Sequence, residues 1–308
     1  MAPSHIHTIT STPVTINVPD EPVKPTTLEE SEVPVDVKPA APKKSALELI
    51  SHGGPILEIP QFVSFDARRQ HILQHMSGAF RVFARRGFTE GMSGHISVRD
   101  PEFPDRFWTN PLGRHFGLLK PSDMVLLDEH GTVVGGNRSR PANAAGFFIH
   151  AAIHKARPDV NAAAHMHSTY GRAWSVFGKK LEMLTQDACI FHGDAQGLYD
   201  AFQGVVFTVE EGKRLADALG PRGKGLILRN HGLLTVGSTV DEAAFLFCSM
   251  ETACKIQLQA DAAGREKHVV PDDEAQKVFE ETSQADSLYW EFQPDLEYEE
   301  AMKEGGEF

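Results

Sequence analysis

Residues 163–168, Ala-Ala-His-Met-His-Ser, constrain the fold of this chain more than any other stretch. They are small and apolar enough to form a buried strand, on which residues two apart point to the same side. His165 and His167 therefore present two imidazoles together, and His231, in an Asn-His-Gly turn, can supply a third. Three neutral imidazoles with open coordination positions are typical of catalytic zinc, although other divalent transition metals also accept them. The alternative is a chance grouping of core or surface residues among 15 histidines.

Composition limits the partners and the compartment. The 308 residues are 41% hydrophobic and carry a net charge of −12, which argues against a nucleic-acid or anionic membrane partner. The three cysteines form no C-x-x-C pair, so a reducing compartment fits. No apolar stretch approaches the roughly 20 residues that a membrane-spanning helix needs. We therefore expect a cytoplasmic protein with a small-molecule substrate and neither a nucleic-acid nor a membrane partner.

Three segments follow one another along the chain. Residues 1–45 are rich in proline and contain no aromatic residue, which predicts a disordered tail. Helical patterns interleave with short strands over residues 60–265, which predicts one α/β domain. Residues 266–308 form a highly charged, acidic C-terminal extension.

The order of motifs in this domain resembles the class II aldolase/adducin superfamily, which includes fuculose- and ribulose-phosphate aldolases and epimerases. The resemblance is carried by residues 91–98, 107–113, 121–127, 146–167 and 228–236. It implies a three-layer α/β/α domain with a central, mostly antiparallel sheet. It also implies a homotetramer with the active site near a subunit interface. Matched residue by residue, His165, His167 and His231 fall on the family's three zinc histidines.

One departure from the family concerns the catalytic base. The aldolases carry an acidic residue in a Pro-Ser-Ser-Glu-like segment, where it ligates zinc at rest and acts as the base. Residues 140–146 of this chain read Arg-Pro-Ala-Asn-Ala-Ala-Gly and contain no carboxylate. The amide of Asn143 can form hydrogen bonds but cannot remove a proton as a base. Aldol cleavage by the standard route is therefore in doubt.

A second departure concerns the phosphate pocket, where the family's sugar-phosphate aldolases match an asparagine at His95. Gly94 and Gly113 remain, so backbone N–H groups can still hold an anion. The resemblance implies substrate contacts from Gly94, His95, Gly113 and Asn143. With hydroxyl groups lost from this pocket, we expect a carboxylated or unphosphorylated substrate rather than a phosphorylated sugar.

Candidate acid–base residues come from two other places. The aldolases' catalytic tyrosine, contributed by a neighbouring subunit, matches Gln186 or lies close to it, and Asp187 is the nearest carboxylate; the alternative for Asp187 is a capping role. Tyr170 follows the zinc histidines and is either a pocket residue or a packing residue. His150 and His154 have the i, i+4 spacing of a helical metal site, or else support the packing of that helix.

The leading hypothesis is a zinc-dependent lyase of the aldolase or decarboxylase type. It would act on a small oxo or hydroxy acid or another carbonyl compound through a metal-stabilised enolate. Decarboxylation needs no base to deprotonate a hydroxyl, so the missing carboxylate affects it less. One alternative is an adducin-like, non-enzymatic scaffold domain, which the Asn-x-x-Gly-Phe run at residues 143–147 resembles. A metal-dependent epimerase or dehydratase is a third hypothesis.

Overall fold

A central sheet forms the middle layer of the fold in the computed structural model, which describes residues 46–54, 58–202, 204 and 208–303. The predicted disordered tail, 1–45, lies outside the described residues. The strands are β1 (His95–Arg99), β2 (Phe107–Thr109), β3 (Val125–Leu127), β4 (Val133–Gly136), β5 (Ala162–Met166), β6 (Gln196–Tyr199), β7 (Gly225–Leu228) and β8 (Gly232–Gly237). Their order is β4-β3-β2-β1-β5-β8-β7-β6, and only the β6–β7 pair is parallel. The mostly antiparallel sheet expected from the sequence is confirmed.

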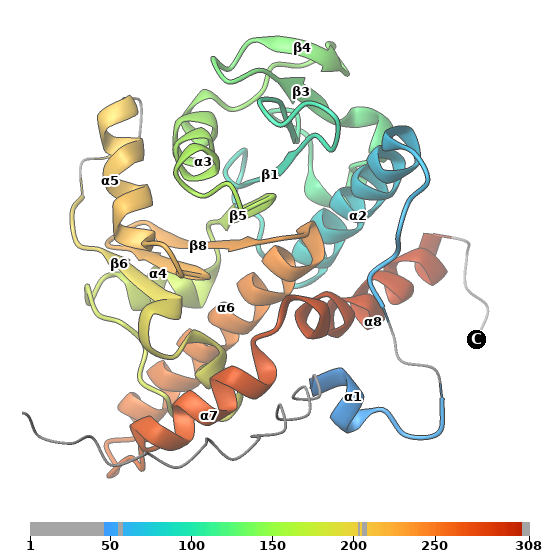
Figure 1. The fold of residues 1–308 in the computed structure, drawn as a ribbon. Helices are drawn as coiled ribbons and strands as arrows, with labels where there is room; N and C mark the ends of the chain where they lie inside the picture. Colours follow the sequence, from blue (N-terminus) through green and yellow to red (C-terminus); the bar gives the residue numbers. More distant parts are fainter. Residues whose placement is uncertain (1–45, 55–57, 203, 205–207, 304–308) are drawn as a thin grey trace, which may run out of the picture. The chain divides into compact units, whose positions relative to one another are not determined.

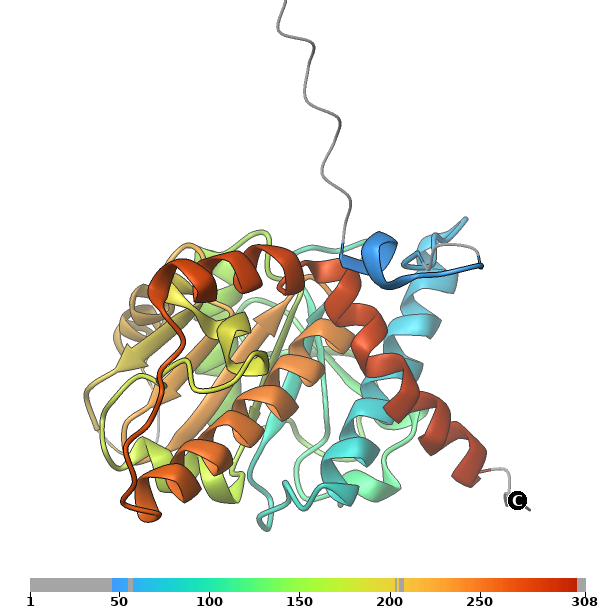
Figure 2. The same ribbon diagram turned by 90° about the horizontal axis from the view of Figure 1, so that it is seen from below.

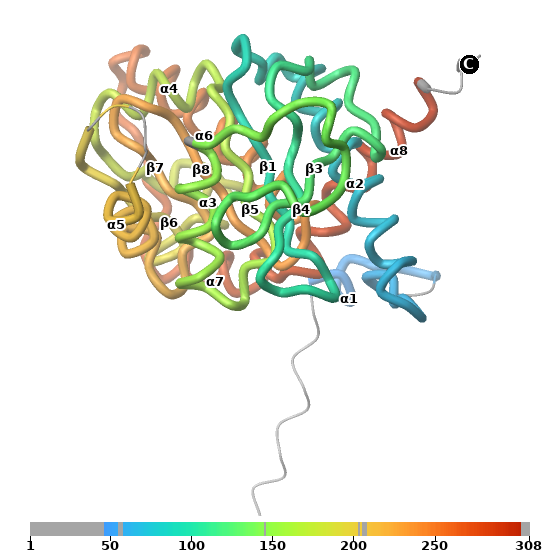
Figure 3. Tube along the Cα trace, turned by 90° about the horizontal axis from the view of Figure 1, so that it is seen from above, coloured from blue at the N-terminus to red at the C-terminus, as the bar shows by residue number. Residues whose placement is uncertain are grey.

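Helices cover both faces of this sheet. They are α1 (Ala46–Ile50), α2 (Phe65–Arg85), α3 (Ala144–Ala156), α4 (Thr169–Ser175), α5 (Val209–Leu219), α6 (Val240–Ala262), α7 (Asp272–Thr282) and α8 (Ala285–Lys303). Figure 3 shows α3 and α5 over one face, and Figure 2 shows α2, α6 and α8 across the opposite face. This arrangement confirms the three-layer α/β/α architecture. None of the described helices combines the length and apolar composition needed to cross a membrane.

Side chains of β5 alternate between the two cores, which decides where its histidines point. Ala162, Ala164 and Met166 belong to the core beneath α2 and α6, whereas Ala163 belongs to the core beneath α3 and α5. Because alternate residues share a face, His165 lies on the α3/α5 side of the sheet, and His167 continues that alternation just beyond the strand. The strand is buried along its whole length, and three of its residues are alanines, so the helical layers pack closely on it beside His165 and Met166.

The acidic C-terminal extension contributes to one of these layers. Helix α8 packs against α6 and α2, and its Leu288 and Phe292 are fully buried. Leu296 fills the space left by a glycine of α2: a Cβ added at Gly78 would lie 2.5 Å from Leu296 Cδ2. The apolar residues of α8 therefore complete the helical layer, and Asp295 and Glu299 pair with Arg85 of α2.

A buried carboxylate fastens the end of β1 to α2. Asp100 accepts hydrogen bonds from Arg69 Nε at 2.8 Å, from Trp108 Nε1 at 2.7 Å and from the backbone N–H groups of Glu102 and Phe103. Burial on its own raises the pKa of this carboxyl, but the hydrogen bonds, led by that of Arg69, outweigh it and lower the pKa to about 2. Asp100 therefore stays ionised at neutral pH as a structural anchor.

Candidate metal centre

The first of the three histidines is oriented by the sheet itself. His165 is 1% exposed, and its Nδ1–H donates to the carbonyl of Leu233 on β8 at 2.7 Å. This bond fixes the neutral tautomer and leaves Nε2 with a lone pair. A backbone carbonyl that holds one ring nitrogen in this way is the usual support of a metal-ligating histidine.

The turn between β7 and β8 presents His231. Asn230 in this turn has φ 58°, a left-handed conformation that asparagine tolerates better than most residues. The N–H of Asn230 bonds the carbonyl of Ser175, and the N–H of His231 bonds that of Leu228. The sharp turn brings His231 Nε2 to 3.1 Å from His167 Nε2.

Together, His165, His167 and His231 have the properties of a metal site. Their candidate ligand atoms all lie within 4.8 Å of one another. Tetrahedral ligands bound at 2.0–2.1 Å stand about 3.3 Å apart, close to the 3.1 Å between the two Nε2 atoms. Burial lowers the pKa of His165 well below its usual range and that of His231 to about 4. Neutral imidazoles with converging lone pairs fit a divalent transition metal.

Two charged residues missed by the sequence reasoning lie at the rim of this cluster. Arg172 Nη2 bonds Glu90 Oε2 at 3.1 Å, and both side chains are about half exposed. A Cβ at Gly232 would lie 3.7 Å from Arg172 Cγ and 4.0 Å from His165 Cε1, which places Arg172 beside the histidines. Burial and the charge of Arg172 lower the pKa of His167, whereas the charge of Glu90 opposes this fall. Arg172 lies five residues after His167, a spacing that could have indicated its position.

A buried carboxylate on α6 holds the segment that follows His167. Glu251 is 4% exposed and accepts hydrogen bonds from Ser168 Oγ at 2.5 Å, Tyr170 N at 2.8 Å and Gly171 N at 2.5 Å. These donors belong to the start of α4, whose first N–H groups have no partner within the helix. The signal in the sequence was an acidic residue within an otherwise apolar stretch of α6.

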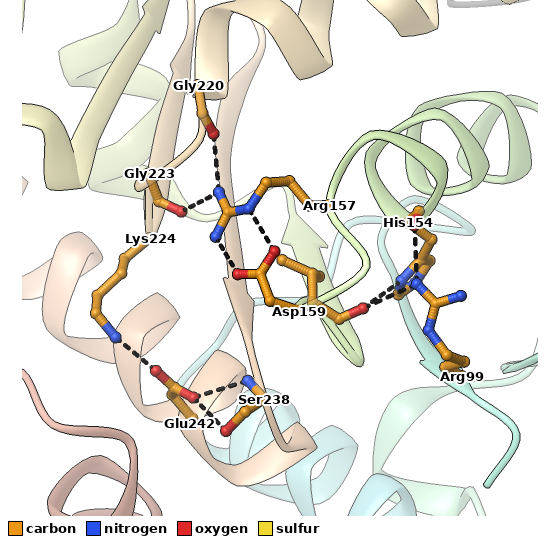
Figure 4. Close-up of polar contacts among 10 residues, drawn as sticks. Arg99, His154, Arg157, Asp159, Gly220, Gly223, Lys224, Ser238 and Glu242 are labelled. Atoms are coloured by element: carbon orange, nitrogen blue, oxygen red, sulfur yellow. Dashed lines mark hydrogen bonds and ion pairs between the residues drawn. The ribbon is translucent and has the colours of Figure 1, made fainter. Parts of the chain in front are cut away.

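A polar clamp holds the loop between α3 and β5 (Figure 4). Arg157 bonds the carbonyls of Gly220 and Gly223 and forms two hydrogen bonds with Asp159, at 2.8 and 2.6 Å. Nearby, Lys224 pairs with Glu242 at 2.7 Å. The loop that leads into the histidine-bearing strand is therefore tied to the end of α5.

Two of the predicted substrate-binding residues lie next to the histidine cluster. His95 pairs with His165 in the β1–β5 register, and their ring centroids are 5.1 Å apart. Gly94, with φ 96°, precedes it; a Cβ there would lie 2.7 Å from Met166 Sδ. The glycine therefore lets the chain approach β5 closely at this point.

The other two predicted substrate-binding residues have local structural partners. Asn143 is the N-cap of α3, with its Oδ1 accepting from Gly146 N at 3.2 Å, and it shares a small cavity with His95. Gly113, with φ 74°, accepts a hydrogen bond from Arg140 Nη1 at 2.7 Å. Their contact with substrate stays a prediction.

Comparison with known proteins agrees with this geometry. Residues 74–258 match the Class II Aldolase and Adducin N-terminal domain. The chain belongs to the class II aldolase/adducin family. It is 42% identical over 250 residues to the Meiotically up-regulated gene 14 protein of Schizosaccharomyces pombe, covering 80% of this chain and 96% of that protein. It is 44% identical over 213 residues to Decarboxylase NovR of Streptomyces niveus, covering 68% and 77% respectively.

Solved structures of the family show the same fold. An L-fuculose 1-phosphate aldolase from Glaciozyma antarctica PI12 is 40% identical, with a TM-score of 0.74, and the match covers 80% of this chain and 96% of that chain. The family assignment confirms the resemblance seen in the order of motifs.

Of the predicted acid–base residues of this class II aldolase/adducin domain, Gln186 and Asp187 line a cavity that contains none of the three histidines. Gln186 and Asp187 are exposed at the start of a 3₁₀ helix, in a cavity shared with Cys248 and Glu291. Tyr170 packs toward α6, with Lys255 Nζ 5.3 Å from its ring centre. A catalytic role for Gln186 or Asp187 stays a prediction that requires a neighbouring subunit.

The second histidine pair belongs to a hydrogen-bonded network. His150 and His154 both bond Ser97 Oγ, at 2.6 and 2.7 Å. Among the described residues, the three-histidine cluster is the one group of three or more His, Cys, Asp or Glu side chains whose ligand atoms converge, and it does not include this pair. The i, i+4 pair therefore supports the packing of α3 on β1.

Proposed function

We propose that this protein is a metal-dependent carbon–carbon lyase, of the decarboxylase or aldolase type, acting on a small oxo or hydroxy acid. The observation that carries the proposal is the cluster of His165, His167 and His231, three neutral imidazoles with no carboxylate among the converging ligands that the structure describes. Such a donor set leaves coordination positions open for substrate oxygens. Zinc is the metal we expect, and imidazole ligands also suit manganese, iron, cobalt or nickel.

In this proposal each group has a defined task. The three histidines hold the cation, and its chemistry there is Lewis acidity toward the oxygens of a bound oxo acid. Arg172, beside the cluster and partly exposed, pairs with the substrate carboxylate. Gly94, His95, Gly113 and Asn143 line the remainder of the substrate site.

The missing base favours decarboxylation over sugar-phosphate cleavage. Residues 140–146 contain no carboxylate where the family's aldolases carry the acidic residue, and Asn143 in this segment caps α3 with its side-chain oxygen. Retro-aldol cleavage needs a group that removes a hydroxyl proton, whereas loss of carbon dioxide does not. The 44% identity to a protein named Decarboxylase NovR supports the same choice.

We also propose a cytoplasmic homotetramer with the active site near a subunit interface. Exposed Gln186 and Asp187, which line a cavity that contains none of the three histidines of their own chain, would then supply acid–base groups to a neighbour. Light scattering on the purified full chain measures the assembly state. Asp187→Asn should lower turnover without changing the metal content.

The test of function uses purified full-length chain loaded separately with Zn²⁺, Mn²⁺, Co²⁺ and Fe²⁺. Each form is incubated with oxaloacetate and with 4-hydroxy-2-oxo acids, in which the bond that breaks lies one carbon beyond the keto group and its electron pair forms the enolate. L-fuculose 1-phosphate is the sugar-phosphate comparison, and released carbon dioxide and carbonyl products are quantified. We expect turnover of an oxo acid that His165→Ala abolishes and that Arg172→Gln weakens mainly through KM. Absence of carbon–carbon cleavage in every metal form would favour the scaffold hypothesis and contradict the proposal.

A further inference from the structure

A continuous row of buried hydrogen bonds between α3 and β1 leads to His95, beside the metal cluster. His154 Nδ1 lies 3.1 Å from the carbonyl oxygen of Val160, and His154 Nε2 lies 2.7 Å from Ser97 Oγ. The same hydroxyl lies 2.6 Å from His150 Nδ1, and His150 Nε2 lies 2.8 Å from His95 Nδ1. The four side chains in this row are between 1% and 6% exposed, so water does not compete for these bonds.

The row begins at a group that can only accept, and this decides the direction of every bond. Because the Val160 carbonyl accepts, His154 carries its proton on Nδ1 and offers a lone pair on Nε2. The hydroxyl proton of Ser97 then points to His154, so Ser97 accepts from Nδ1–H of His150. Nε2 of His150 in turn accepts from Nδ1–H of His95. A neutral imidazole carries one N–H proton. In His95 this proton is on Nδ1, so Nε2 carries a lone pair and no proton.

The neutrality of these imidazoles follows from their surroundings. In the described structure the row contains no carboxylate, and burial lowers the pKa of His154 to about 3. Arg99 lies against His154 at the outer end of the row, where its Nη2 donates to the His154 carbonyl at 2.8 Å (Figure 4). A second positive charge beside this guanidinium is unfavourable.

The bare nitrogen of His95 lies between the metal cluster and the first turn of α3. The His95 ring is 5.1 Å from that of His165. On its other side, a Cβ at Gly146 would lie 2.6 Å from His95 Nε2 and 2.4 Å from Cδ2. Glycine at this position therefore leaves room for the imidazole edge, and among the described residues Nε2 has no hydrogen-bond partner.

We propose that His95 Nε2 is a fixed hydrogen-bond acceptor that selects substrates with a neutral hydroxyl group near the metal-bound oxygens and rejects phosphate esters. A phosphate oxygen would face this lone pair with its own, which is repulsive, whereas a hydroxyl donates to it. Ser97, His150 and His154 act as positioning residues that hold the His95 ring in the accepting tautomer. This inference rests on the proposed function, because it assumes an oxo-acid substrate bound at the cluster.

The tautomers can be measured directly, independently of metal and activity. Two-bond ¹H–¹⁵N correlation spectra of the full chain labelled with ¹⁵N-histidine distinguish Nδ1–H from Nε2–H imidazoles, and His→Gln variants at 95, 150 and 154 assign the signals. We expect all three residues as Nδ1–H tautomers, and Ser97→Ala should change the His150 and His95 patterns. A proton on Nε2 of His95 in the unmodified chain overturns the inference.

Selectivity is tested by calorimetric titration of the zinc-loaded chain with pyruvate, 3-hydroxypyruvate and 3-phosphohydroxypyruvate. One added hydrogen bond predicts that hydroxypyruvate binds about tenfold more tightly than pyruvate, and the phosphate ester should bind more weakly than both. His95→Phe should bring pyruvate and hydroxypyruvate within about twofold of each other. Equal binding of the first two probes, or tighter binding of the ester, overturns the inference. Zinc content measured on the same sample separates this failure from failure of the proposed metal site.

Discussion

Removal of the Glu251 carboxylate should cost this fold several kcal/mol, because three donors at the start of α4 depend on it. Ser168 Oγ and Gly171 N donate to Glu251 within buried surroundings, and Tyr170 N does so from a partly buried position. An orphaned buried donor costs about 1–3 kcal/mol. Two effects reduce this loss: the partly buried N–H of Tyr170 can bond water instead, and Glu251→Ala removes the cost of burying a carboxylate. Glu251→Ala should therefore lower the free energy of unfolding by about 3–5 kcal/mol.

Urea unfolding followed by circular dichroism, at one fixed protein concentration, measures this loss. Glu251→Gln keeps one acceptor oxygen and should lose about half as much. Lys255→Ala is the matched control, because Lys255 lies one turn further along the same helix, is exposed, and within the described residues contacts the face of the Tyr170 ring. If the free energy of unfolding of Glu251→Ala lies within about 1 kcal/mol of that of the unmodified chain, with an unchanged m-value, these hydrogen bonds do not stabilise the fold as stated.

Three further predictions concern packing and pH. The pKa of Asp100 is about 2, below its ordinary value of 3.8, so its ionised form should add about 2 kcal/mol to the free energy of unfolding above pH 4. This contribution is lost as the pH falls toward 2. Acid unfolding curves should show the loss, and Asp100→Asn should make stability less dependent on pH in this range. Gly78→Ala, which places a Cβ 2.5 Å from Leu296 Cδ2, should destabilise by about 1–3 kcal/mol, and Leu296→Ala should recover part of that loss in a double-mutant cycle; strictly additive losses would contradict the contact. Gly146→Ala should displace the His95 ring and abolish oxo-acid turnover while circular dichroism shows the fold retained; full activity would contradict this placement.

Local patterns predicted much of the fold. The small residues of β5 and the position of its two histidines followed from period-two alternation, and both cores bear this out. The Asn-His-Gly sequence at residues 230–232 predicted a tight turn, and in the structure Asn230 adopts a left-handed conformation there. These features depend on neighbours within a few positions, so they can be read from the sequence.

Features made by distant partners could not be predicted in this way. Strand β6 begins at Gln196, a polar residue that is 4% exposed because its amide bonds both backbone groups of Leu181. The charge of α8 obscured the fully buried Leu288, whereas the docking of Phe292 on the domain could be expected from its aromatic side chain. Glu251 and Arg172 acquire their positions only when segments about 80 residues apart meet. The histidine spacing on α3 was visible, but its serine partner on β1 was not.

Metal stoichiometry tests the central claim most directly. The full chain, purified without added metal or chelator, is analysed by inductively coupled plasma mass spectrometry and then titrated with Zn²⁺, alongside His165→Ala and His231→Ala variants. We expect about one divalent transition-metal ion per chain in the unmodified protein. Both variants should lose that ion while circular dichroism shows the fold retained. A chain that turns over an oxo acid without stoichiometric metal, or variants that keep the ion, would contradict this claim.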